Sequence, residues 1–279
     1  PEERCKSEAL FLTLKASSSV MSIVFVLSTS SVVIGCSAIL PAFGIFPIMT
    51  TITANLQAIH TRIASAPRQS CRNPDDITLL AVSKTWSAES VRAAAAAGQR
   101  RFGENYVQEG VSKATELSGL GLEWHFIGPL QSNKTRAVAE TFAWVHSVDR
   151  LKIAERLAEQ RPEALPPLQV CVQVNVSNEA SKHGVPLDAA GALMMQIARL
   201  PRLRLRGLMA IPAPNPDYEA QRRALRPVRE LFERLRADGL AIDTLSMGMS
   251  HDLEAAIAEG ATLVRVGTAI FGERSKAGA

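Results

Sequence analysis

Short apolar runs alternate with helical patterns along most of the chain from Ile77 onward. The runs are nearly continuous in hydrophobic residues, which is typical of strands covered on both faces. Eight strands are predicted, over residues 77–83, 100–105, 122–128, 143–148, 168–176, 203–211, 242–248 and 262–269. Helices are predicted between them, over residues 87–97, 106–117, 134–140, 151–160, 188–200, 218–237 and 251–259. Ser87 is placed to cap the first of these helices, and Gly98 suits its left-handed end.

Strand followed by helix, repeated eight times, indicates a parallel sheet covered by helices. Eight such units suit closure into a (β/α)₈ TIM barrel, the α/β fold that we expect here. An open, doubly wound sheet is the alternative. The eighth predicted strand ends close to Ala279, so we expect no second domain after it.

Residues 1–48 do not share this pattern. The segment from Ala16 to Thr61 contains no Asp, Glu, Lys or Arg, and Val20–Met49 is mostly apolar. Its length would admit a membrane span or an uncleaved signal segment. The polar run Ser28–Ser31 and two prolines interrupt it, however, which weakens the membrane interpretation.

A helical pattern begins directly after Met49. Ile52, Leu56, Ile59 and Ile63 recur at the spacing of one helix face. We therefore expect Met49 to be the natural start, with residues 1–48 an upstream-translated or artificial extension. A genuine signal or anchor and a packed structural extension remain the alternatives.

Composition narrows the class of protein. Hydrophobic residues make up 47% and charged residues 21%, which is ordinary for a soluble globular chain and unlike a disordered one. The formal charge of +4 comes from interleaved Lys and Arg, so we interpret it as solvated helix faces and expect no nucleic-acid partner. The four cysteines form no CxxC pair, which argues against a zinc site or a disulfide framework and favours a reducing compartment.

Ligands bind at the carboxyl ends of the strands in such a barrel, so the polar residues there are the candidates. Lys84 follows the first strand. Burial of its amine would lower the pKa and make it a nucleophile of the Schiff-base kind, although a lysine beyond a strand can also point into solvent. Asn105, after the second strand, offers an amide or a helix cap. His125 in the third strand is favoured as a satisfied core histidine over a ligand.

The ends of the seventh and eighth strands carry small and hydroxyl-bearing residues. They are Ser246, Gly248, Ser250, Gly267 and Thr268. Loops at this position commonly hold a phosphate through backbone N–H groups, although plain turns would have a similar composition. Arg265 lies deeper in the barrel than these rim residues, where it could reach the ring of a bound ligand. An amine and a phosphate site meet across the seam that closes a barrel, and pyridoxal 5′-phosphate (PLP) needs both.

Seven sequence blocks carry a resemblance to a known family. They are AVSKT (81–85), FGENYVQE (102–109), WHFIGPLQSNK (124–134), VNVSNEASKHG (175–184), GLMAIP (207–212), LSMGMSHDLEAAI (245–257) and VRVGTAIFGER (264–274). From about Thr50 to its C-terminus the chain resembles the pyridoxal phosphate homeostasis protein family, the barrel-only relatives of alanine racemase. We therefore expect two parts, the apolar extension over residues 1–48 and a PLP-binding barrel over 49–279.

The resemblance implies a role for each site residue. It makes Lys84 the internal-aldimine lysine and assigns the phosphate to Ser250, Gly267 and Thr268. Arg265 would face the pyridine nitrogen and Asn105 would lie near the ring. Lys182 resembles a second family lysine with a suggested part in cofactor release. Two residues depart from the family pattern: Trp86 stands where many relatives carry Lys, and His251 where an Asp is common.

The resemblance also implies a cytoplasmic protein that balances the PLP pool without established turnover. The alternative is a PLP-dependent racemase or lyase. A racemase needs a second acid or base, in that family a Tyr from an added domain, and neither Tyr106 nor Tyr218 is evidently placed for this. An Arg at the pyridine nitrogen would disfavour ring protonation and weaken the electron sink. We expect a PLP-binding carrier or regulator, a monomer or weak dimer without metal or membrane partner, with apo PLP-dependent enzymes as candidate recipients.

Overall fold

The computed structural model describes residues 15–17, 20–22, 46–66, 72–176 and 183–273. By its contacts the chain divides into two units, Pro1–Phe46 and Pro47–Ala279. In the first unit, β1 (Lys15–Ser17) pairs antiparallel with β2 (Val20–Ser22). Most of the predicted extension over residues 1–48 lies outside the described residues, so its origin stays a prediction.

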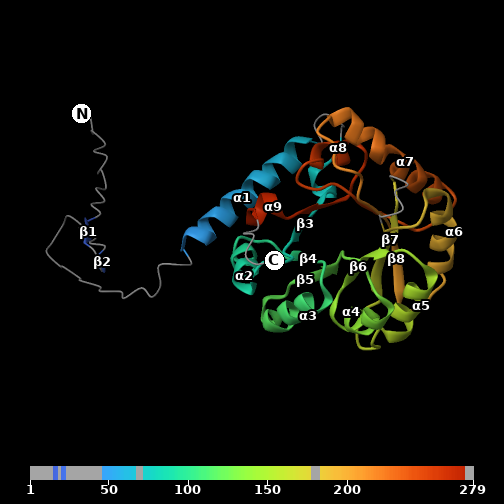
Figure 1. Cartoon of the computed structure of the whole chain (residues 1–279), viewed down its shortest axis with the longest axis horizontal. Helices are drawn as coiled ribbons and strands as arrows, with labels where there is room; N and C mark the ends of the chain where they lie inside the picture. The colour runs from blue at the N-terminus through green and yellow to red at the C-terminus, as the bar shows by residue number, and fades with distance from the viewer. Residues whose placement is uncertain (1–14, 18–19, 23–45, 67–71, 177–182, 274–279) are drawn as a thin grey trace, which may run out of the picture. The chain divides into compact units, whose positions relative to one another are not determined.

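The second unit is built around a closed barrel of parallel strands (Figure 1). The strands are β3 (Thr78–Val82), β4 (Arg101–Glu104), β5 (Glu123–Phe126), β6 (Trp144–Val148), β7 (Leu168–Val174), β8 (Leu203–Ala210), β9 (Thr244–Ser246) and β10 (Leu263–Val266). Each strand pairs with the next along the chain, and β10 pairs with β3 to close the circle. The predicted TIM barrel is confirmed, and the open doubly wound sheet is excluded.

Helices cover the outside of the barrel. They are α2 (Ala88–Ala96), α3 (Val107–Glu116), α4 (Thr135–Thr141), α5 (Leu151–Gln160), α6 (Leu187–Ile197), α7 (Tyr218–Ala237), α8 (Leu253–Ala258) and α9 (Thr268–Phe271). Short 3₁₀ turns occur at Pro74–Asp76, Ser118–Leu120 and Ser132–Lys134. The expected cap of α2 is confirmed, since Ser87 Oγ accepts the Ser90 N–H at 3.3 Å, and Gly98 follows with φ +99°.

The end of the chain differs from the prediction in one element. The eighth strand was expected to run to residue 269, but β10 ends at Val266 and residues from Thr268 form the short helix α9. Gly267 makes this turn where the chain passes close to β3: a Cβ there would lie 3.1 Å from the Val82 carbonyl oxygen. The apolar run continues through the turn, so the pattern alone concealed the boundary.

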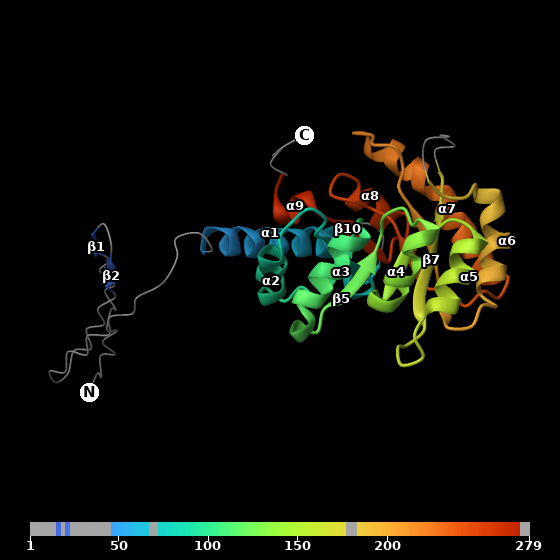
Figure 2. The same ribbon diagram turned by 60° about the horizontal axis from the view of Figure 1, so that its bottom comes forward.

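The first barrel helix, α1 (Phe46–Ser65), precedes the strands and buries one apolar face. Ile52, Leu56, Ile59 and Ile63 are each at most 5% exposed, as their spacing predicted. Both views place α1 beside α9 (Figures 1 and 2), and Asn55 Nδ2 donates to the Ile270 carbonyl at 2.8 Å. None of the helices in the described ranges has the length and apolar character that a bilayer span requires.

Candidate functional site

A cavity of about 240 Å³ opens at the carboxyl ends of the strands. Its walls come from the segments after β3, β4, β5, β8, β9 and β10. The lining residues are Val82, Lys84, Trp86, Asn105, Ile127, Ile211, Met249, Ser250, His251, Arg265, Gly267 and Thr268. Six of the predicted site residues are therefore brought together here. Trp86 and His251, which depart from the family pattern, line the same cavity.

Ser246 and Gly248 are not part of this lining. Ser246 is fully buried behind Arg265, and Gly248 turns the chain with φ +94° where a Cβ would come within 2.6 Å of the Ala256 Cβ. Direct contact of these two residues with a ligand stays a prediction, whereas their supporting position is now evident. Lys182 lies outside the described residues.

A tight turn presents Lys84 to the cavity. Lys84 is half-buried and lies between Ser83, which is buried, and Thr85, which is exposed. The backbone of Thr85 has a φ of +67°, a left-handed conformation that is unfavourable for a β-branched residue. The Thr85 N–H donates to the Glu109 carboxylate of α3, and the Trp86 N–H donates to the Ser83 carbonyl at 3.1 Å. These bonds hold the turn in a conformation that its residues would not choose alone.

A buried cluster of charges supports the same turn from below. Lys113 Nζ donates to the Ser83 carbonyl at 2.7 Å, to Glu104 Oε1 at 2.8 Å and to Glu109 Oε1 at 2.7 Å. Ser83 Oγ also donates to Glu104 Oε1, at 2.7 Å. Burial raises the pKa of the Glu104 carboxyl, and the hydrogen bonds from Lys113 and Ser83 oppose that rise. The cluster links the lysine turn to the next βα unit.

The sequence interpretation missed this cluster. Glu104 and Glu109 lie inside the FGENYVQE block, and Lys113 follows one helical turn later on α3. The available signal was their spacing, because Glu109 and Lys113 are four residues apart and so share a helix face. The depth of Glu104 and Lys113, with side chains 0% and 7% exposed, becomes evident only once β4 is placed in the barrel.

Arg265 forms the floor of the cavity. Its guanidinium donates to the Ser246 carbonyl at 2.5 Å, to Ser246 Oγ at 2.8 Å and to the Ala210 carbonyl at 2.9 Å. Burial lowers the pKa of Arg265 to about 10, so it remains a cation at neutral pH. A cation that donates only to neutral oxygens can still donate to an acceptor in the cavity.

Asn105 stands on the wall of the cavity, and its alternative role as a helix cap is wrong. The N-cap position of α3 is Tyr106, whose side chain makes no capping bond. Among the described residues, Asn105 Oδ1 is buried without a hydrogen-bond partner. An orphaned buried oxygen carries a cost of about 1–3 kcal/mol, which a ligand that donates a hydrogen bond would relieve.

The remaining wall lies at the seam between β10 and β3, and α1 braces it from outside. Ser250 and Thr268 stand near the mouth, with Gly267 between β10 and α9. Arg62 of α1 donates from Nη2 to the Ser250 carbonyl at 3.1 Å and pairs with Glu254 at 2.7 Å. The two loops expected to hold a phosphate are thus both tied to the same helix, since Asn55 bonds the Ile270 carbonyl.

Trp86 packs its ring on Phe271 of α9, with centroids 5.8 Å apart. The aromatic side chain therefore joins the lysine turn to the helix after β10. His251 is exposed at the mouth of the cavity, and its carbonyl accepts from Gln221 Nε2 at 3.1 Å. In the described ranges, no group of three or more His, Cys, Asp or Glu side chains is arranged to hold a metal ion.

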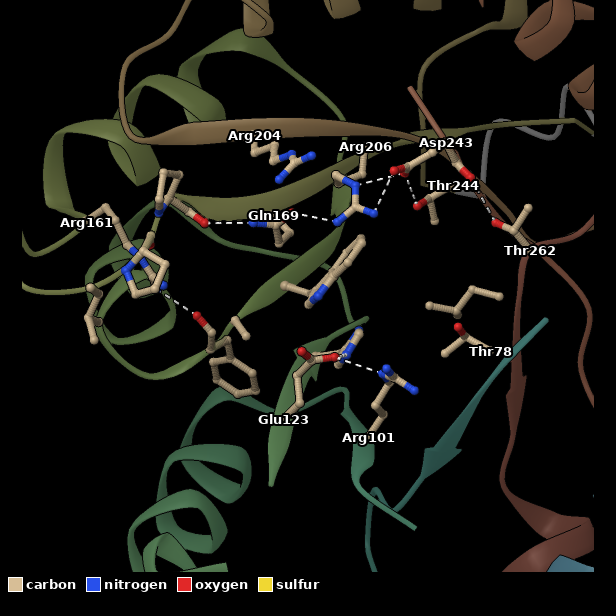
Figure 3. Close-up of a pocket in the computed structure, with 18 of the residues that line it drawn as sticks. Thr78, Arg101, Glu123, Arg161, Gln169, Arg204, Arg206, Asp243, Thr244 and Thr262 are labelled. Atoms are coloured by element: carbon tan, nitrogen blue, oxygen red, sulfur yellow. Dashed lines mark hydrogen bonds and ion pairs between the residues drawn. The ribbon is translucent and has the colours of Figure 1, made fainter. Parts of the chain in front are cut away.

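A larger cavity, of about 780 Å³, opens at the amino ends of the strands (Figure 3). Two of its arginines pair with carboxylates of the same cavity, Arg101 with Glu123 at 3.2 Å and Arg206 with Asp243 in a bidentate pair at 2.8 Å. No lysine is among the described residues that line it. Size alone therefore does not identify the ligand site, and we assign it to the smaller cavity on chemical grounds.

The chain is similar to known proteins in both sequence and fold. Residues 54–275 match the family model of the alanine racemase N-terminal domain. The pyridoxal phosphate homeostasis protein of Pseudomonas aeruginosa is 59% identical over 226 residues, covering 81% of this chain and 97% of that protein. The Escherichia coli K12 protein of the same name is 56% identical over 229 residues, covering 81% and 98%. The solved structure of Synechococcus elongatus PipY with PLP bound is 37% identical with a TM-score of 0.69, covering 79% of this chain and all of that one.

Proposed function

Because this chain belongs to the pyridoxal phosphate homeostasis protein family, we propose that it binds PLP through Lys84 and helps to balance the cellular pool of that cofactor. One observation carries the assignment of the site. Lys84, Asn105, Arg265 and the seam residues Gly267 and Thr268 line a single cavity at the carboxyl rim. The relative PipY, solved with PLP bound, supports the choice of ligand.

The residues present fit the parts of PLP. Lys84 supplies the amine that carries the aldehyde carbon, and Arg265 donates a hydrogen bond toward the pyridine nitrogen. The orphaned Asn105 Oδ1 lines the same cavity and would lie beside the ring. Ser250, Gly267 and Thr268 hold the phosphate with hydroxyl and backbone N–H groups at the seam. We propose Lys182 as a secondary lysine for cofactor release.

The same geometry favours a carrier over a racemase or lyase. Bound PLP supplies an electron sink, and that sink is stronger when the ring nitrogen is protonated. Arg265 is still a cation at neutral pH and would offer that nitrogen a hydrogen-bond donor. No carboxylate that could hold a proton on the nitrogen is among the described residues that line the cavity. Tyr106 and Tyr218 are 57% and 36% exposed, and neither lines the cavity. We therefore propose delivery of the cofactor to apo-enzymes in the cytoplasm, without robust turnover.

Chemical trapping tests the site. Purified protein that has been mixed with PLP and freed of unbound cofactor should absorb in the near-visible region, and borohydride reduction followed by peptide mapping should find the pyridoxyl group on Lys84. Lys84→Ala should lose the label, whereas Lys152→Ala, at an exposed lysine of α5, should retain it. Stoichiometric label on a different lysine of the wild-type protein would refute the assignment.

Isotope exchange separates the carrier from the enzyme. The loaded protein is incubated with L- and D-alanine in deuterated water, and the α-hydrogen is followed by mass spectrometry. A carrier should show exchange no faster than free PLP, and should transfer its PLP to an apo-enzyme. Rapid exchange that depends on Lys84 would establish the racemase alternative.

A further inference from the structure

A line of hydrogen bonds crosses the barrel interior from Arg265 to Glu123. Arg265 Nη1 donates to Ser246 Oγ at 2.8 Å, and Ser246 Oγ lies 2.8 Å from His146 Nδ1. His146 Nε2 lies 2.9 Å from His125 Nδ1, and His125 Nε2 lies 2.9 Å from Glu123 Oε1. We call Ser246, His146, His125 and Glu123 the interior chain. It connects strands that are not all neighbours in the sheet, since β7 and β8 separate β6 from β9.

The two ends of this line and the protonation state of its histidines together determine the direction of every bond in it. Arg265 can only donate, so Ser246 Oγ accepts from it, and the direction of the bond between Ser246 and His146 then depends on the protonation of the histidines. An ionised Glu123 can only accept, so the hydrogen of His125 is on Nε2. His125 Nδ1 then accepts from His146 Nε2–H. With both imidazoles neutral, as their lowered pKa values indicate, each is an Nε2–H tautomer, and His146 Nδ1 accepts the Ser246 hydroxyl hydrogen.

Burial and charge agree with this pattern. His125, His146 and Ser246 are 1%, 0% and 0% exposed. Burial lowers the pKa of both histidines, most strongly that of His146, so both are neutral at pH 7. The hydrogen bond from His125 lowers the pKa of Glu123 and keeps it ionised. A buried cation and a carboxylate thus stand at opposite ends of a neutral, polarisable line.

The line joins two cavities. Arg265 lines the proposed cofactor cavity, and Glu123 lines the larger cavity at the amino ends of the strands. Figure 3 shows Glu123 and Arg101 directed toward each other there, with Arg101 Nε 3.2 Å from Glu123 Oε1. Trp144 stacks on His125 with centroids 5.2 Å apart and rings 7° from parallel, and fixes the orientation of that imidazole. The amino-end mouth is therefore in hydrogen-bonded contact with the floor of the site.

We propose that the interior chain consists of positioning residues that direct Arg265 toward the cofactor, so that the charge state of the amino-end mouth tunes cofactor affinity. The inference rests on the proposed function, because Arg265 is taken to face the PLP ring. Arg265 also donates to the Ser246 and Ala210 carbonyls, so it stays in the floor when the chain is broken. A moderate loss of affinity is therefore expected, together with a changed ring environment.

The test compares two carboxylates of the same mouth. Glu123→Gln removes the charged end of the chain, and Glu140→Gln is the matched control, because Glu140 lines the same cavity and pairs with Arg136 outside the chain. Glu123→Gln and Ser246→Ala should each raise the Kd for PLP about five-fold, the effect of one hydrogen bond. Both should shift the absorption maximum of bound PLP, whereas Glu140→Gln should match the wild type.

Imidazole ¹⁵N spectra of the protein without PLP provide a readout independent of binding. His125 and His146 should both be neutral Nε2–H tautomers at pH 7, and Ser246→Ala should change the His146 signals. An imidazolium or an Nδ1–H tautomer in the wild type would overturn the inference. So would PLP affinities and spectra of Glu123→Gln and Ser246→Ala that match Glu140→Gln. Absence of PLP binding by the wild type would instead overturn the proposed function and, with it, this inference.

Discussion

At the scale of single residues, the site depends on groups that a ligand would never touch. Lys84 lies in a turn in which Thr85 has an unfavourable backbone conformation. Lys113 supports this turn by donating hydrogen bonds to the Ser83 carbonyl and to two carboxylates. Strained conformations of this kind persist only where their surroundings determine them. The sequence pointed to Lys84 because it follows a buried strand, but nothing in the local pattern singled out Lys113 on the helix after β4. Its burial follows from tertiary packing, which no local pattern encodes.

Lys113→Met should destabilise the protein by about 3 kcal/mol, because Glu104 would be left as a buried carboxylate without its cation. The free energy of unfolding in urea measures this. PLP affinity should fall as well, since the lysine turn loses its support. Adding Glu104→Gln should recover at least about 1 kcal/mol, because the amide removes the unpaired charge and still accepts from Ser83. Lys152→Met, at an exposed position of α5, is the control, and an equal loss there would contradict the argument.

At the scale of elements, the hydrophobic pattern predicted the eight strands and therefore the rim where the site lies. Strand ends were less well predicted, since β9 and β10 are shorter than the apolar runs that contain them. The helix α9 was missed because TAIF continues the apolar character of the strand before it. The bracing role of α1 was also not predictable. Its apolar face could be inferred from spacing, but the partners of Arg62 and Asn55 lie about two hundred residues away in the chain.

Arg62→Met should weaken PLP binding about three-fold with little change in stability. The substitution removes the bond to the Ser250 carbonyl and so loosens the loop proposed to hold the phosphate. The ion pair with Glu254 is more than one-third exposed on both sides, so its loss should cost well under 1 kcal/mol. Titration with PLP and thermal unfolding measure the two effects. Arg92→Met, in an exposed pair with Glu116, should change neither, and an equal loss of affinity there would remove α1 from the account.

At the scale of the whole molecule, barrel closure creates the site, because β3 and β10 come from opposite ends of the folded unit. Their pairing brings Leu80 beside Arg265 and Ala81 beside Val266, and so places the lysine turn against Gly267. The repeated strand–helix pattern was sufficient to predict this seam, since a closed barrel must join its first and last strands. It could not predict what fills the interior, because the partners of His146 and Ser246 are set by strands across the barrel.

We propose that residues 49–279 form the complete PLP-binding unit. The match to the family begins at residue 54, and Ile52 belongs to the buried face of α1. The free energy of unfolding of a chain that starts at Met49 should therefore lie within about 1 kcal/mol of that of the full chain, because the core is left intact. Its Kd for PLP should equal that of the full chain within about two-fold. Urea unfolding and PLP titration of both chains provide the comparison.

A chain starting at Pro67 provides the contrast. It lacks the four buried aliphatic side chains of α1, each worth about 1.5–3 kcal/mol, and exposes the barrel surface that they cover. Their sum is comparable with the whole stability of a typical domain, so this chain should be unfolded or aggregated. If the chain from Met49 also failed to fold, or bound PLP ten-fold more weakly, residues before Met49 would belong to the functional unit. The boundary between extension and barrel would then have to move toward the N-terminus.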